Sequence, residues 1–232
     1  MSFDHSISRR SVFKGAGGLA VASALGAGAV MSLVLLLGRV VRSAVTLLLV
    51  GVMIGYLVSA GVSVMMSFST PQLIAAYSRW HFGSYGGVTW GNLVLISLVI
   101  GAGLLASLTL AKPLNALLLG ERYAESMGLR LTMMRTALIA LTSVLAGTVT
   151  AFCGPIQFLG IAVPHLARGM FNTSDHRVLI PATALTGALL ALTADIIAGL
   201  PGDSVLPLNA INAAFGAPVV IWILLQRRRA AL

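Results

Sequence analysis

The sequence predicts an all-α polytopic membrane protein whose residues 1–232 form a single transmembrane domain. The chain is 58% hydrophobic and only 9% charged, and its mean hydropathy is +0.97. A soluble domain of this size needs more polar groups for its surface. The 25 glycines are unfavourable in soluble helices, but they suit membrane helices that pack closely.

Six apolar stretches approach the length of about 20 residues that crosses a hydrocarbon core about 30 Å thick. They span residues 15–37, 44–68, 92–111, 136–152, 178–200 and 207–225. A seventh stretch, residues 154–167, is short and begins with Gly154 and Pro155, which weaken a helix. We expect a broken or re-entrant helix there, surrounded by protein or a watery cavity. The sequence therefore predicts about seven membrane helices.

Basic residues predict the orientation of these helices. Three arginines, Arg227 to Arg229, lie near the end of the chain, and the positive-inside rule then places the C-terminus in the cytoplasm. The loop with Arg168 and Arg177 and the polar stretch 112–135 fall on the same side. Residues 69–91 and 201–206, which together contain a single basic residue, fall outside. The expected location is the inner membrane of a bacterium.

The N-terminal residues 1–30 are atypical for such a domain. An inside C-terminus and seven crossings leave residues 1–14 outside, although these contain Arg9, Arg10 and Lys14. Residues 8–14 also resemble a twin-arginine export signal. A cleavable signal fits poorly, because apolar sequence continues through residues 31–37. The alternative is that Met1 is not the natural start of the domain.

The net charge of +9 does not indicate nucleic-acid binding. The basic residues lie between apolar runs and at the ends of the chain, which is typical of topology signals and contacts with the surface of a lipid bilayer. The sequence contains neither a P-loop nor a cluster of His and Glu residues. We therefore expect no catalytic residue, metal site or cofactor on this chain, and an energy source on another chain.

Several motifs occur in a fixed order through the second half of the chain. They include KPLN at 112–115, LGE at 119–121, GPI at 154–156, VPH at 163–165, DHR at 175–177 and GAP at 216–218. Together with SYGGVTW at 84–90, they resemble the FecCD-type permease of ATP-binding-cassette importers for iron–siderophore, haem and cobalamin. The resemblance covers residues 35–229. Two departures from the family pattern, Gly199 and Val205, affect the region where relatives contact a binding protein.

The resemblance implies a fold of about ten helices with both termini in the cytoplasm, so that an N-terminal portion of about three helices is absent here. It implies import by alternating access of an iron complex (siderophore or haem) or cobalamin. The implied partners are an ATPase subunit, a periplasmic or lipid-anchored substrate-binding protein, a second permease copy and the lipid bilayer. Two alternatives stay open: an ion-coupled secondary transporter, which requires ionisable residues near the midplane, and an inactive fragment lacking the first helices.

The polar stretch 112–135 predicts a short helix over residues 117–127. Pro113 is expected to end the third span, and Gly128 is expected to follow the helix at C′. Glu121 and Glu125 repel each other at i, i+4, so the helix gains from a partner. The resemblance makes this stretch the segment that couples to the ATPase, and the alternative is a solvated loop. The expected coupling residues are Leu114, Leu117, Gly120, Glu121, Arg122, Ala124, Met127 and Gly128.

A second set of residues is expected to line or gate the translocation path. It comprises Gly83, Gly86, Gly87, Gly154, Pro155, Pro164 and His165. The glycines permit tight turns, and the prolines interrupt helices. The alternatives are an aromatic belt over residues 69–90, close packing of a short helix, and a histidine that donates to a carbonyl. Asp195 lies near the outer end of its helix, where capping or pairing is expected rather than ion coupling.

Overall fold

The computed structural model describes residues 22–33, 36–37, 44–200 and 206–229, and contains no strand among them. The all-α prediction is therefore confirmed for this part of the chain. Residues 1–21, with the signal-like stretch 8–14, lie outside it. The helices are Ala22–Leu33, α2 (Ala44–Ser67), α3 (Pro71–His81), η1 (Tyr85–Gly87), α4 (Trp90–Thr109), α5 (Ala111–Leu118), α6 (Glu121–Ser126), α7 (Leu131–Cys153), α8 (Leu159–Phe171), α9 (His176–Gly199) and α10 (Leu208–Arg229).

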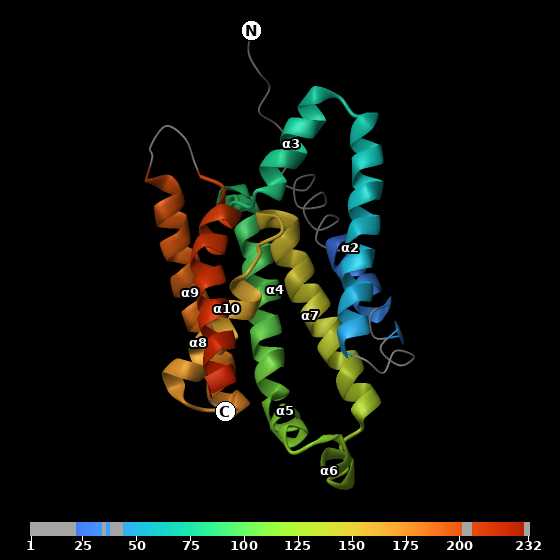
Figure 1. Ribbon diagram of the computed structural model, residues 1–232, viewed down its shortest axis with the longest axis vertical. Coiled ribbons are helices and arrows are strands. Elements are labelled where there is room, and N and C mark those ends of the chain that lie inside the picture. Colours follow the sequence, from blue (N-terminus) through green and yellow to red (C-terminus); the bar gives the residue numbers. More distant parts are fainter. Residues whose placement is uncertain (1–21, 34–35, 38–43, 201–205, 230–232) are drawn as a thin grey trace.

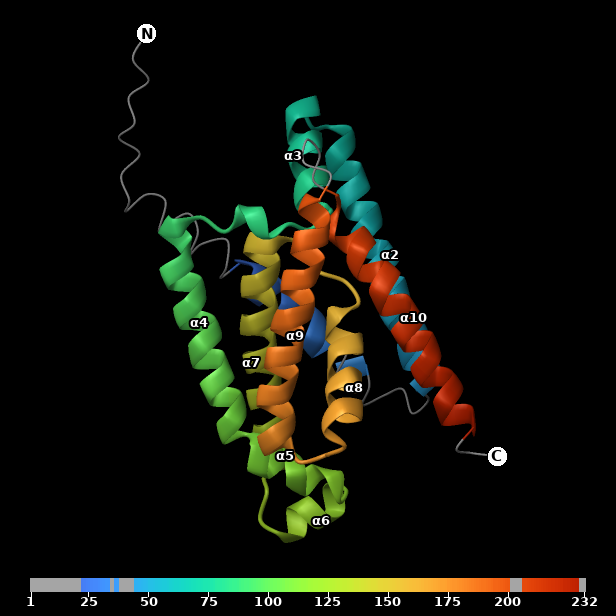
Figure 2. The ribbon, with the colours of Figure 1, turned by 90° about the vertical axis from the view of Figure 1, so that its left-hand side faces the viewer.

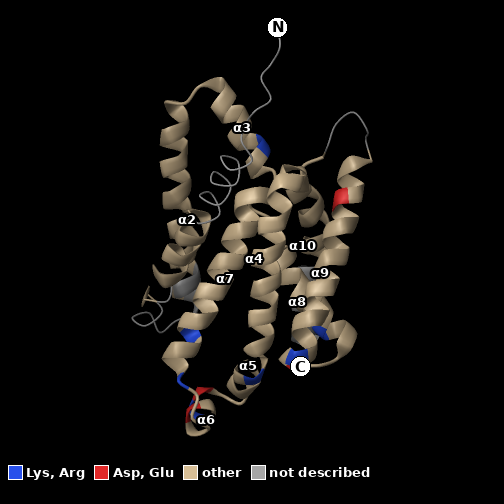
Figure 3. Cartoon of the chain, turned by 180° about the vertical axis from the view of Figure 1, so that it is seen from behind, with Lys and Arg blue, Asp and Glu red and all other residues tan. Residues whose placement is uncertain are grey.

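The long helices run between two ends of an elongated bundle (Figures 1 and 2). One end carries α3 and η1, and we call it the α3 end. The opposite end, which we call the α6 end, carries α5, α6, the connection from α8 to α9 and the end of α10. The described connection 69–89, expected outside the cell, thus lies at the α3 end, whereas the connections 110–130 and 172–175, expected inside, lie at the α6 end. Most charged residues of the described chain lie at the α6 end (Figure 3).

Four helical stretches are long and apolar enough to cross a membrane: Leu49–Ser67, Trp90–Thr109, Leu131–Cys153 and His176–Gly199. They match four of the predicted spans. The expected break in the short span 154–167 is confirmed, because residues 154–158 form no helix. The expected bounds are wrong, since α8 runs from Leu159 to Phe171. Gly154 (φ 79°) and Phe158 (φ 66°) have backbone angles that a right-handed helix does not allow. The chain therefore descends from the α3 end without a helix before α8 begins (Figure 2).

Alanines make many of the contacts between helices, whereas many large apolar side chains are exposed. Ala167 of α8 packs with Leu179 and Ala182 of α9. A second cluster joins α9 to α10 through Ala194, Ala198, Leu208 and Ile211. Leu189 and Leu192, by contrast, are each at least 60% exposed. This distribution is typical of helices that face lipid, where close packing replaces the hydrophobic effect as the source of helix association.

The helix Ala22–Leu33 crosses α7 at a contact between small residues. A Cβ atom at Gly147 would overlap the backbone of Ser23 and Ala24, and a Cβ atom at Gly28 would lie 3.5 Å from Oγ of Ser143. The two small residues on each helix are four positions apart, so both lie on the contacting face. The crossing therefore depends on the missing side chain of Gly147.

We predict that Gly147→Val separates this crossing and lowers the stability by about 1–3 kcal/mol, the usual cost of overpacking a close contact. Stability is measured by unfolding in mixed micelles followed by circular dichroism. Gly101→Val on α4 is the matched control, because no atom lies within 4 Å of its Cβ position. Equal losses in the two variants would contradict the crossing.

Candidate functional site

The α6 end is built around two glycines with positive φ. Gly120 (φ 104°, ψ 151°) separates α5 from α6, and Gly128 (φ 86°) follows α6. The N–H of Gly128 donates to the carbonyl of Glu125 (2.9 Å), and that of Leu129 donates to the carbonyl of Ala124 (3.0 Å). This pair of bonds is a Schellman motif, which confirms Gly128 at C′.

The prediction of one helix over residues 117–127 is wrong, because the backbone of Gly120 cannot belong to a helix. Residues 117 and 118 end α5, and residues 121–126 form α6. Pro113 does not end the third span either. The helix α4 ends at Thr109 and α5 begins at Ala111. Pro113 therefore lies in the first turn of α5. Backbone N–H groups of a first turn have no partner within the helix, so proline costs no hydrogen bond there.

The expected coupling residues differ in exposure. Ala124 is fully buried, and Leu114 and Leu117 are half-buried. The others are exposed: Gly120, Glu121, Arg122, Met127 and Gly128. Leu117 lies in α5 and Ala124 in α6, with Gly120 between the two helices, so these residues do not form one helical face. The coupling role of these residues stays a prediction.

Four large side chains at the α6 end are more than half exposed, in a part of the molecule expected to face the cytoplasm. They are Leu118 (53%), Leu119 (65%), Tyr123 (52%) and Met127 (64%). Sequence reasoning included only Met127 among them. The sequence does contain a signal for Leu118, Leu119 and Tyr123, because large apolar residues are unfavourable in a polar segment that faces water.

One charged pair fixes α6 against α7. Nη2 of Arg135 lies 2.6 Å from Oε1 of Glu121, and the side chains are 50% and 59% exposed. Such an exposed pair contributes at most about 1 kcal/mol. It also offsets the expected repulsion between Glu121 and Glu125 by giving one carboxylate a cation. The exposed face of α6 then presents Glu125 and Arg122 beside the apolar side chains.

Asn115 joins α5 to the start of α9. Its Nδ2 donates to Oδ1 of Asp175 (2.6 Å), and its Oδ1 accepts from the N–H of His176 (2.8 Å). Asp175 caps α9 by accepting from the N–H of Arg177 (2.9 Å). The hydrogen bond from the Arg177 N–H, and to a smaller extent that from the Asn115 amide, stabilise the ionised carboxylate. They hold the pKa of Asp175 below its usual value. Asp175 is therefore the N-cap of α9.

At the α3 end, Asn209 connects three segments that are far apart in sequence. Its Nδ2 donates to the carbonyls of Pro155 (2.7 Å) and His81 (3.1 Å). Its Oδ1 accepts from the N–H of Gln157 (3.2 Å), and its own N–H donates to the carbonyl of Phe82 (3.1 Å). One amide thus holds the end of α3, the non-helical segment 154–158 and the start of α10 together. We call this arrangement the Asn209 clamp.

Glycines permit the close backbone contacts around the clamp. The carbonyl of Phe152 would lie 2.5 Å from a Cβ atom at Gly87. A Cβ atom at Gly154 would overlap the carbonyl of Trp80, and Gly83 (φ 74°) lies against Asn209. The N–H of Ser84 also donates to the carbonyl of Cys153 (2.9 Å). Four of the expected gating residues, Gly83, Gly87, Gly154 and Pro155, therefore meet here.

The other expected gating residues lie elsewhere. Gly86 donates its N–H to Oγ of Ser84 (3.1 Å) in a local turn. Pro164 and His165 are half-buried inside α8, and no hydrogen bond to the His165 ring occurs among the described residues. Sequence reasoning missed Asn209. Its signal was an amide at the start of an apolar helix, where an unpaired polar group is costly.

Tyr85 packs beside the clamp, against the cluster of Ala194, Ala198, Leu208 and Ile211. Burial raises the pKa of Tyr85 to about 12, with smaller contributions from the neighbouring Cys153 and Asp195. The phenol is therefore protonated at neutral pH. The side chain of Asp195 is exposed, and no hydrogen bond to it occurs among the described residues. The capping or pairing expected of Asp195 is not seen in this part of the chain.

Comparison with known proteins places the chain among transport proteins. The model of the FecCD transport family matches residues 11–226. The vitamin B12 import system permease protein BtuC of Citrobacter koseri is 39% identical over 184 residues, covering 79% of this chain and 55% of the relative. BtuC of Escherichia coli O9:H4 is 40% identical, with 79% and 56% covered. The chain therefore spans little more than half the length of these curated relatives.

A solved structure supports the same fold. It is described as an inward-facing conformation of a metal-chelate type ABC transporter, and it is 28% identical to this chain. The superposition has a TM-score of 0.78 and covers 94% of this chain and 71% of the other. The arrangement of helices described above is thus that of an ABC transporter permease.

We predict that Asp175→Asn removes part of the pH dependence of stability. A lowered carboxyl pKa stabilises the fold above the unfolded value of about 3.9, and this contribution is lost as pH falls through the folded pKa. Asparagine also caps helices well, so the cap is retained. Thermal unfolding is measured from pH 6.5 down to pH 3. The difference in stability between the wild type and the variant should become smaller as the pH falls. An advantage that stays constant with pH would contradict the assignment.

We also predict that Asn209→Leu destabilises the protein by about 1–3 kcal/mol, because three backbone groups lose a hydrogen-bond partner that contributes about 0.5–1.5 kcal/mol each. Thermal unfolding of the purified protein measures the change. Gln157→Leu is the matched control, since Gln157 joins the clamp through its backbone N–H and its side chain is exposed. An effect of Gln157→Leu as large as that of Asn209→Leu would show that the clamp does not stabilise the fold.

Proposed function

Because the chain belongs to the FecCD transport family, we propose that it is the membrane-spanning permease of an ATP-driven importer. The proposed cargo is a metal chelate: cobalamin, haem or an iron–siderophore complex. The names of the relatives in the comparison support this class, since one group imports vitamin B12 and the solved structure is of metal-chelate type. Energy comes from a separate ATPase subunit. The proposed assembly also includes a second permease copy and a substrate-binding protein.

The observation that carries this proposal is the exposed apolar surface of the α6 end. Leu118, Leu119, Tyr123 and Met127 project from two short helices beyond the long membrane helices. A surface of this kind gains free energy by docking to a protein. Tyrosine is also enriched among the residues that dominate binding energy at protein interfaces. We therefore place the ATPase contact on α5 and α6, on the cytoplasmic side of the membrane.

The proposed mechanism transmits force along packed helices. Movement of α5 reaches the start of α9 through the hydrogen bonds of Asn115 to Asp175 and His176. The cluster of Ala194, Ala198, Leu208 and Ile211 then joins α9 to α10. The helix α10 begins beside Asn209, whose amide holds the end of α3 and residues 155–157. A tilt of α9 and α10 therefore displaces the Asn209 clamp, which we propose as part of the outer gate.

The decisive experiment is co-purification with the ATPase subunit. We predict that Tyr123→Ala weakens the complex about tenfold or more, which corresponds to about 1.4 kcal/mol. Gly128→Pro should have a similar effect, because proline cannot adopt a φ of 86° and its missing N–H breaks the Schellman motif. Affinity is measured by titrating the labelled ATPase against the permease in nanodiscs.

The matched control is Tyr56→Ala on α2, because Tyr56 is 67% exposed but lies in a membrane helix. It should leave the affinity unchanged. Full association of both Tyr123→Ala and Gly128→Pro would refute docking at α5 and α6. Uptake that persists without ATP would instead favour the ion-coupled alternative.

A further inference from the structure

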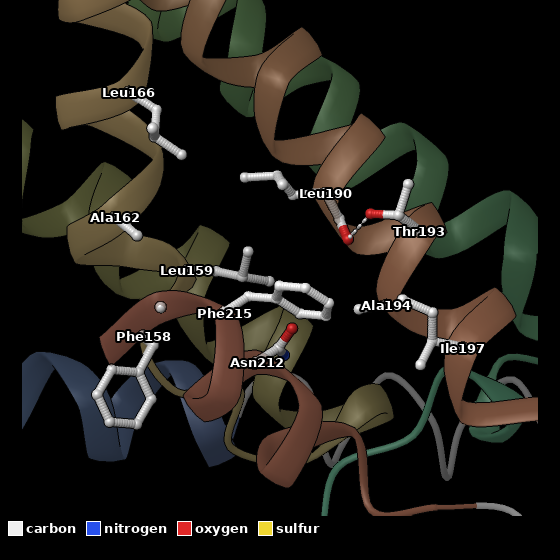
Figure 4. A pocket seen from close by; sticks show the side chains of 11 residues that line it. Phe158, Leu159, Ala162, Leu166, Leu190, Thr193, Ala194, Ile197, Asn212 and Phe215 are labelled. Atoms are coloured by element: carbon white, nitrogen blue, oxygen red, sulfur yellow. Dashed lines mark hydrogen bonds between the residues drawn. The ribbon is translucent and has the colours of Figure 1, made fainter. Parts of the chain in front are cut away.

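A cavity of about 260 Å³ lies where α8, α9 and α10 meet. Leu159 and Ala162 line it from α8, Leu190 and Ala194 from α9, and Asn212 and Phe215 from α10. In Figure 4 the ring of Phe215 lies between Leu159 and Ala194, with Asn212 beside it. No residue of α5 or α6 lines the cavity. Phe158, at the end of segment 154–158, also lines it, and Ala194 belongs to the cluster that joins α9 to α10. The proposed transport mechanism places no ligand in this cavity.

Asn212 is the exceptional residue of this cavity. Its side chain is only 4% exposed. Its Nδ2 atom is buried and has no hydrogen-bond partner within the described part of the chain. The other polar side chain of the wall, Thr193, already donates its hydroxyl proton to the carbonyl of Leu190 (2.8 Å). A buried amide without a partner is rare in folded proteins, which makes its position in a cavity wall informative.

Water does not explain this cavity well. A buried water molecule needs two to four polar partners, and cavities lined by Leu, Ile and Phe stay dry. Here the unpartnered amide lies at one place in a wall that is otherwise mainly aliphatic and aromatic. A dry cavity of about 150 Å³ already accepts benzene. A volume of about 260 Å³ therefore suits a ring with a small polar substituent.

We propose that this cavity binds a small, lipid-soluble ring compound that carries one hydrogen-bond acceptor, with Nδ2 of Asn212 as the donor. The ring packs against Phe215 and the aliphatic wall, and the acceptor oxygen satisfies the amide. Phenols have this chemistry. A metal chelate of the proposed cargo class is far larger than the cavity, so the ligand is not the cargo. Because residues of α8, α9 and α10 line the cavity, a bound ligand contacts all three helices and holds them in one arrangement.

Binding is tested with two ¹⁹F NMR probes, 4-fluorophenol and fluorobenzene, titrated against the full 232-residue chain in nanodiscs. Binding to the site is saturable, whereas partition into lipid is not. We expect saturable binding of both probes, with 4-fluorophenol at least fivefold tighter. No ATPase or cargo is needed, so the result is independent of the proposed transport function. Absence of saturable binding, or equal affinity for the two probes, would overturn the proposal.

Variants locate the site. Asn212→Leu should abolish the preference for 4-fluorophenol while fluorobenzene still binds. Ala162→Leu should fill the cavity and eliminate both signals, and Ala194→Leu replaces it if circular dichroism shows that the variant does not fold. The matched control is Ala188→Leu on α9, where the alanine is exposed and does not line the cavity. Saturable binding that survives Ala162→Leu and Ala194→Leu would place the probes elsewhere and refute this assignment.

Discussion

The break between α7 and α8 requires partners for backbone groups that no helix satisfies. Residues 154–158 form no helix although they lie between two apolar helices, and unsatisfied peptide groups are costly in apolar surroundings. Asn209 meets this requirement by donating to the carbonyl of Pro155 and accepting from the N–H of Gln157. Its remaining donors bind the end of α3. The short α8 and the position of α10 both depend on this clamp.

The rest of the bundle is held by close packing of small residues. Alanines at the α8–α9 and α9–α10 contacts and Gly147 at the crossing with the first described helix allow the backbones to approach. Such contacts slide more easily than interlocked large side chains, because little volume has to be displaced. A protein that alternates between two arrangements of its helices needs this property. The two ends can then move together while each keeps its own hydrogen-bonded junction, Asn115 at one and Asn209 at the other.

Among the four buried or half-buried asparagines of the described chain, Asn115, Asn209 and Asn212 have different physical roles. Asn115 and Asn209 each satisfy several polar groups of distant segments. Asn212 has an unpartnered donor in an apolar cavity. An amide whose hydrogen bonds are complete stabilises the fold, whereas one left without a partner costs stability. That contrast is the reason for treating Asn115 and Asn209 as junctions between segments and for proposing Asn212 as a ligand-binding residue.

The sequence by itself determined the all-helical membrane class, the positions of the long apolar helices, the family and the terminating role of Gly128. These features follow from local composition, periodicity and turn chemistry. Only the tertiary structure decided that Gly120 splits one expected helix into two, because its φ of 104° depends on how α6 packs against α7. The meeting of Gly83, Gly87 and Gly154 with Asn209, and the cavity beside Asn212, likewise join residues from distant segments. A linear pattern does not specify which distant backbone group an amide will reach, since that depends on how the helices pack.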